Sequence, residues 1–130
     1  MEKLAEEIRC VCKNLRPRTI ERIRVRTFGY FDVFVDGRPV SFKLSKSKEI
    51  LAFLVDKCGA GVTRAEIFAG VWGDALYDRK MQKQLDVIIR SMRSTLEEYG
   101  ISEIFEMNKG SLRICPEKFD CDLYRFLEGD

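Results

Sequence analysis

The chain has 130 residues and a formal net charge of only +2; 45% of the residues are hydrophobic and 34% are charged. This length suffices for one domain with a core and a short appendage, and the composition is ordinary for a soluble globular domain. The absence of histidine removes the usual proton shuttle at neutral pH and the commonest metal ligand. Charged residues follow Met1, and no apolar run approaches the roughly 18 residues that span a bilayer, so we expect neither secretion nor a membrane span.

Five cysteines are present, an odd number: Cys10, Cys12, Cys58, Cys115 and Cys121. Four of them would suffice for zinc on count alone, but no C-x-x-C occurs and the spacings do not resemble a zinc site. Reduced thiols in a cytoplasmic protein explain the pattern better than a disulfide framework. The sequence therefore predicts no metal and no cofactor.

The first segment, residues 2–15, has apolar residues at helical spacing, namely Leu4, Ile8, Val11 and Leu15. This pattern predicts one amphipathic helix, whose narrow stripe must pack on the domain body, on a second copy or on an upstream domain. Pro17 ends the helix, because the residue before a proline avoids the helical region. Residues 16–22 then form a basic linker.

From Ile23 the apolar residues alternate, which predicts strands over residues 23–27 and 31–36. Asp36-Gly37 is a strong tight-turn signal, because both central positions of a type I′ turn need positive φ. Val40 and Phe42 suggest a short third strand, which Pro39 would start at a sheet edge. The result is a small antiparallel N-terminal sheet.

Three helices follow. Ser45 or Ser47 can cap the first, which runs to Cys58. Thr63 and Glu66 match a capping box at the start of the second, whose apolar side includes Trp72. Asp78 caps a long third helix, which Gly100 closes.

The long helix has two different faces. Apolar residues at helical spacing predict a buried stripe of Met81, Leu85, Ile88, Ile89, Met92, Leu96 and Tyr99. The other face is basic and amide-bearing, and it carries Arg79, Lys80, Lys83, Gln84, Val87, Arg90, Ser91 and Ser94. Taken alone, such a face is more often only solvated than a binding surface. Two strands over residues 104–107 and 111–115 follow around Asn108-Lys109-Gly110, and residues 119–127 suggest a short helix.

This order resembles the winged-helix effector domain of OmpR/PhoB-type bacterial response regulators, which is shared with SARP-type activators. The resemblance rests on "FGYFDVFVDGRPVSF", "LSKSKEILAFLV", "VTRAEIFAGVWG", "QLDVIIRSMRSTLE" and the hairpin around "NKG". It implies an α+β winged helix-turn-helix with a small N-terminal antiparallel sheet, a three-helix core and a C-terminal β-hairpin wing, preceded by one amphipathic helix.

The expected organisation is a helix and linker over residues 1–22, a winged-helix domain over 23–116 and an acidic tail over 117–130. The segment "LAEEIRCVCKNLRPR" resembles the last helix and linker of an upstream receiver domain. The segment "FDCDLYRFLEGD" resembles the start of the extra region of SARP-like proteins. The chain therefore reads as a fragment of a longer response regulator.

The resemblance implies that the long helix lies in the major groove of double-stranded DNA. Lys83, Gln84, Arg90 and Arg93 fall where the family contacts phosphates. Val87 falls where the family touches a thymine methyl group, and Ser91 stands where it often carries a base-reading arginine. Because a serine discriminates bases less than a bidentate arginine, either specificity is modest or Lys80, Lys83 and Gln84 supply more of it.

Three lysines outside the long helix complete the expected contacts. Lys109 at the hairpin tip is the candidate for the minor groove or a phosphate, and Lys46 and Lys48 are candidates for backbone phosphates. The loop 73–77 falls where the family can touch RNA polymerase, and tandem sites would pair the protein as a homodimer. The alternative function is a winged helix that binds protein without binding DNA. An enzyme is not expected, because no histidine, phosphate-cradling glycine loop or nucleophile with a base is present.

Overall fold

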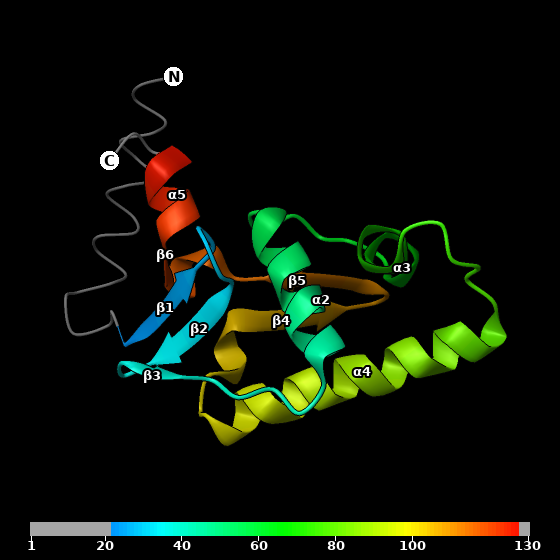
Figure 1. Ribbon diagram of the computed structural model, residues 1–130, viewed down its shortest axis with the longest axis horizontal. Coiled ribbons are helices and arrows are strands. Elements are labelled where there is room, and N and C mark those ends of the chain that lie inside the picture. The colour runs from blue at the N-terminus through cyan, green and yellow to red at the C-terminus, as the bar shows by residue number, and fades with distance from the viewer. Residues whose placement is uncertain (1–21, 128–130) are drawn as a thin grey trace. The chain divides into compact units, whose positions relative to one another are not determined.

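A computed structural model describes residues 22–127 of the chain (Figure 1). These residues belong to two compact units, one reaching to Val40 and resuming at Cys115, the other running from Ser41 to Ile114. The amphipathic helix predicted at residues 2–15 and most of the basic linker lie outside the described residues.

The first unit is built on a four-stranded sheet in the order β3-β2-β1-β6. Strands β1 (Ile23–Arg26) and β2 (Asp32–Val35) pair antiparallel, and their alternating residues are buried on one face. Asp36 and Gly37 have φ values of 52° and 82°, so the predicted tight turn after β2 is confirmed.

The third strand differs from its prediction. It was expected through Val40 and Phe42, but β3 comprises Arg38–Pro39, with Pro39 opposite Phe34. Proline is accommodated because β3 is an edge strand, where no neighbour requires its missing N–H group. One further bond, from Val40 N to Val33 O at 2.8 Å, ends the pairing.

The C-terminal segment adds a strand that the sequence pattern did not reveal. After a 3₁₀ turn, η3 (Pro116–Lys118), strand β6 (Asp120–Cys121) pairs parallel with β1, so the sheet is not purely antiparallel. The expected short helix is confirmed as α5 (Asp122–Leu127), but it begins after β6 rather than at Phe119. Phe119 is fully buried in this unit.

The second unit contains three helices, α2 (Ser45–Asp56), α3 (Arg64–Trp72) and α4 (Arg79–Glu98). A 3₁₀ turn, η2 (Ser102–Ile104), leads into a hairpin of β4 (Phe105–Asn108) and β5 (Ser111–Ile114). Helix α2 packs against α3, α4 and β5 (Figure 1). The fully buried side chains of this unit include Ile50, Leu51, Leu54, Ile67, Leu85, Met92, Leu96, Ile101, Leu112 and Ile114.

Two of the three predicted helix starts are confirmed. Thr63 and Glu66 form the full capping box, and Asp78 accepts a hydrogen bond from the Met81 N–H at 2.9 Å. The prediction for α2 was wrong, because Leu44 occupies the N-cap and makes no side-chain cap. Ser47 is instead fully buried and donates its hydroxyl to the Ile88 carbonyl of α4 at 3.0 Å.

The predicted stripe of α4 is mostly confirmed. Leu85, Ile88, Ile89, Met92 and Leu96 are buried, whereas Met81 and Tyr99, at the two ends of the stripe, are only half-buried. Thr95 is buried as well, because its hydroxyl is satisfied by the Ser91 carbonyl at 3.0 Å. Trp72 is half-buried, and its ring stacks on that of Phe68 with centroids 5.0 Å apart.

Candidate nucleic-acid interface

The outer face of α4 carries most of the predicted contacts. Lys80, Lys83, Gln84, Val87 and Arg90 are all exposed, and Ser91 is half-buried. Residues three and four positions apart lie on one helix face, so these side chains form a single surface. We call this set the α4 face.

Val87 is the unusual member of the α4 face, because 53% of this apolar side chain is exposed. Lysines and glutamine surround it on the same helix face. More than half of this apolar side chain is therefore open to a ligand. Its position suits contact with a methyl group on a ligand.

Arg93 points away from the α4 face. It is exposed, and its Nη1 lies 3.8 Å from the Met107 sulfur of β4. Arg90, three residues earlier, is the member of the α4 face that lies nearest to Arg93 on the helix. The structure therefore divides the predicted α4 contacts into a main face and a flank next to the hairpin.

The hairpin holds its tip lysine in a tight turn. Lys109 is exposed with φ of 36°, and Gly110 follows at φ of 84°, a value that glycine adopts without strain. Val62 braces the hairpin by exchanging two hydrogen bonds with Leu112, at 2.9 and 2.8 Å. Arg113 adds a bond to the Gly59 carbonyl at 2.9 Å and an ion pair with Glu106 at 3.1 Å. The strand that follows the Lys109 tip is therefore held by hydrogen bonds to the segment before α3.

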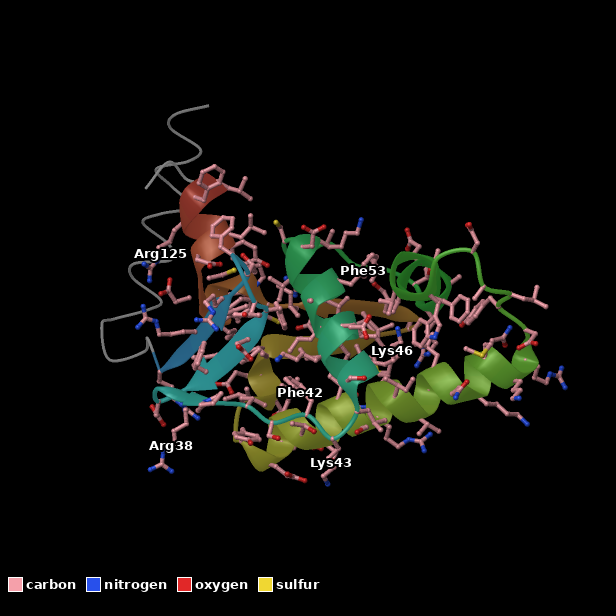
Figure 2. The ribbon with its side chains drawn as sticks, viewed as in Figure 1. Arg38, Phe42, Lys43, Lys46, Phe53 and Arg125 are labelled. Atoms are coloured by element: carbon pink, nitrogen blue, oxygen red, sulfur yellow. The ribbon has the colours of Figure 1, made fainter. Side chains whose placement is uncertain are left out.

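The two predicted lysines of α2 are placed differently from the α4 face. Lys46, which Figure 2 labels on α2, pairs with Glu49 at 3.2 Å and lies 5.2 Å from the centre of the Trp72 ring. Lys48 is half-buried. An exposed ion pair contributes little to stability, so Lys46 can leave Glu49 and bind another anion at little cost.

Asp86 of α4 accepts a hydrogen bond from Arg64, the first residue of α3, whose Nε lies 2.7 Å from Asp86 Oδ1. Nothing in the pattern signals this pair, because the two residues lie 22 positions apart on different helices. Near them, burial raises the pKa of Tyr77, with Asp86 adding to the effect and Arg64 opposing it.

Comparison with known families decides the identity of this arrangement. A family model described as "Transcriptional regulatory protein, C terminal" matches residues 39–110, more than half of the chain. The chain belongs to this family. The match runs from β3 through the three helices to the hairpin turn, and it confirms the OmpR/PhoB-type resemblance and the α+β winged-helix fold.

In this winged-helix fold, α4 is the last of the three helices and the β4–β5 hairpin is the wing. The family consists of DNA-binding regulatory domains and is not an enzyme family. No curated protein sequence matches the chain significantly. Among residues 22–127, no helix combines the length and apolar character needed to cross a membrane, and no group of three metal-binding side chains gathers.

Proposed function

We propose that this protein binds specific sequences of double-stranded DNA and regulates transcription as the output domain of a cytoplasmic two-component response regulator. Recognition helix α4 enters the major groove and the wing reaches the neighbouring minor groove. The observation that carries the proposal is the α4 face, an exposed surface of cations and amides on a helix of 20 residues. The major groove admits one such helix and displays a distinct pattern for each base pair.

The contacts divide into positioning and reading. Lys83 and Arg90 bind phosphates, which hold the helix in register, and Lys109 does so from the wing or enters the minor groove. Val87 meets a thymine methyl group, and Gln84 can bond to adenine or to a phosphate. Lys80, exposed at the start of α4, can read a base or bind the backbone.

Ser91 is a weak base reader in this arrangement. Its side chain is half-buried, and a hydroxyl discriminates bases less than a bidentate arginine. Specificity therefore rests on the first half of α4, with Lys80, Gln84 and Val87.

The family context supplies the remaining partners. An upstream receiver domain would carry the phosphorylation switch, and two copies would bind neighbouring half-sites as a homodimer. The loop 73–77 between α3 and α4 would contact RNA polymerase, and it exposes 76% of Leu76. Lys46 and Lys48 would add phosphate contacts from the start of α2.

Salt dependence of binding to a duplex selected from a random pool tests the proposal. Lys83→Ala should weaken binding to every sequence and reduce the slope of log K against log salt by about 0.9, the value for one phosphate contact. Lys57→Ala is the matched control, because it removes a lysine that lies outside the proposed DNA contacts. Lys57 is the C-cap of α2, and its Nζ lies 5.0 Å from the centre of the Phe53 ring. An unchanged slope in a folded Lys83→Ala protein contradicts the contact.

The selected sequences test the geometry. A consensus of direct repeats spaced by about one helical turn is expected for tandem half-sites. If duplex DNA shows no salt-dependent binding while the chain self-associates through Leu4, Ile8, Val11 and Leu15, the protein-binding alternative replaces DNA binding.

A further inference from the structure

A hollow of about 260 Å³ lies between α3, α4 and β4 in the second unit. It is lined by Arg64, Asp86, Ile89, Arg90, Arg93 and Met107. Three guanidinium groups thus converge on one concave surface, and a single carboxylate accompanies them. We call this hollow the arginine hollow.

Within residues 22–127, several N–H donors of these guanidinium groups have no protein acceptor. Arg64 uses one of its five N–H donors on Asp86, and within residues 22–127 its terminal nitrogens meet no other acceptor. In the same part of the chain, the Arg90 side chain makes no hydrogen bond or ion pair. Arg93 makes one long contact, from Nη1 to the Met107 sulfur. The hollow therefore offers several unused donors to an anion.

The location of the hollow identifies that anion. If α4 occupies the major groove and the wing the adjacent minor groove, the sugar-phosphate backbone that separates the two grooves must pass between them. The arginine hollow lies there, since α4 supplies Asp86 through Arg93 and β4 of the wing supplies Met107. Guanidinium groups match the oxygens of a phosphate by paired N–H donors.

We propose that the arginine hollow seats one phosphodiester group of the DNA strand that runs between recognition helix and wing. Arg64 and Arg90 bind its oxygens from two different helices, and Arg93 closes the wing side. The proposal rests on the proposed function and extends it to Arg64, a residue of α3 that lies outside the α4 face.

Asp86 is the positioning residue of this seat. Its carboxylate holds Arg64 through Nε at 2.7 Å, and that orientation leaves the two terminal nitrogens of the guanidinium for the phosphate. The pair is partly exposed, with 33% and 47% of the two side chains accessible, so its own contribution to folding is small. Its effect is on the geometry of Arg64.

Four proteins test the seat on the selected duplex: wild type, Arg64→Ala, Arg64→Lys and Asp86→Asn. Arg64→Ala should weaken binding by about tenfold or more and lower the salt slope by about 0.9. Arg64→Lys should recover the slope but not the full affinity, because an ammonium group lacks the paired donors. Circular dichroism confirms that each variant is folded.

A phosphate scan localises the contact. Replacing single phosphates by neutral methylphosphonates should reveal one position where wild type loses more affinity than Arg64→Ala, because only Arg90 and Arg93 remain to contact that phosphate in the variant. Asp86→Asn should weaken binding when Arg64 is present, because Arg64 then loses its orientation. In the Arg64→Ala background, Asp86→Asn should have no effect on binding. A simple count of charge predicts the opposite for Asp86→Asn, namely tighter binding in both backgrounds.

The outcomes separate the two proposals. Salt-dependent binding by wild type with an unchanged slope for Arg64→Ala overturns the seat and leaves the proposed function standing. Equal losses by wild type and Arg64→Ala at every methylphosphonate also overturn it. Tighter binding by Asp86→Asn in both backgrounds overturns the positioning role. Absence of salt-dependent binding by wild type overturns both the seat and the proposed function.

Discussion

Ser47 offers the sharpest test of how helix α4 is anchored to α2. If it capped α2, its side chain would face solvent, and aspartate would replace it without loss, since both are good N-cap residues. In the structure, Ser47 is fully buried inside α2, and its hydroxyl donates to the Ile88 carbonyl of α4 at 3.0 Å. Replacement by aspartate would therefore bury a negative charge against a carbonyl oxygen.

The magnitudes follow from this environment. Ser47→Ala removes one neutral hydrogen bond, which contributes about 1 kcal/mol to the free energy of unfolding. Ser47→Asp removes the donor and buries an unpaired charge, a change that costs about 3 kcal/mol or more. Ser45→Asp is the matched control, because Ser45 is exposed in the first turn of α2. A negative charge there interacts favourably with the helix dipole by about 0.3–1 kcal/mol.

Urea unfolding followed by circular dichroism measures these differences directly. The expected order of stability is Ser45→Asp at or above wild type, then Ser47→Ala, with Ser47→Asp lowest. If Ser47→Asp is as stable as wild type, the serine is not buried as described. The anchor between α2 and α4 would then be wrong.

Two further predictions concern the first unit. Asp122 accepts hydrogen bonds from Thr27 Oγ1 at 2.6 Å, Thr27 N at 2.9 Å and Phe28 N at 3.1 Å. Burial opposes its ionisation, but these bonds outweigh burial and lower its pKa from the ordinary 3.8. Its contribution to stability is therefore complete above about pH 4 and is lost as the pH falls through the lower folded value. The stability gap between wild type and Asp122→Asn should be constant at neutral pH and shrink in acid titrations; a gap independent of pH contradicts the assignment. Burial raises the pKa of the Cys121 thiol to about 11, and this side chain is closed to reagents. The pKa of the Cys58 thiol is also raised, by partial burial and by Asp56, but Cys58 is exposed and can be reached. With Cys10 and Cys12 replaced by serine, iodoacetamide should modify Cys58 first and Cys121 only after unfolding, as mass spectrometry would show.

Features of short range were predictable from the sequence. The capping box at Thr63, the cap at Asp78 and the Asp36-Gly37 turn each depend on residues within four positions of one another. The buried stripe and exposed face of α4 follow from helical periodicity alone. The order of these elements resembles a known family, and that resemblance implies the winged-helix fold, which the family match confirms.

Features of long range were decided by the tertiary structure. Arg24 of β1 pairs with Asp120 of β6, although the two residues are far apart in the sequence. No local pattern distinguishes the two-residue strand β6 from a loop. Ser47 illustrates the same point, because a serine near a helix start suits a cap until a carbonyl on another helix approaches it.

The proposed DNA-binding surface combines both kinds of information. Periodicity was sufficient to place Lys80, Lys83, Gln84 and Val87 on one exposed face of α4. Only the tertiary fold brought Arg64 of α3 to Asp86 of α4, and only β4 of the wing completed the arginine hollow with Met107. Helix faces are set by backbone geometry within one segment, whereas a hollow exists only where separate segments meet.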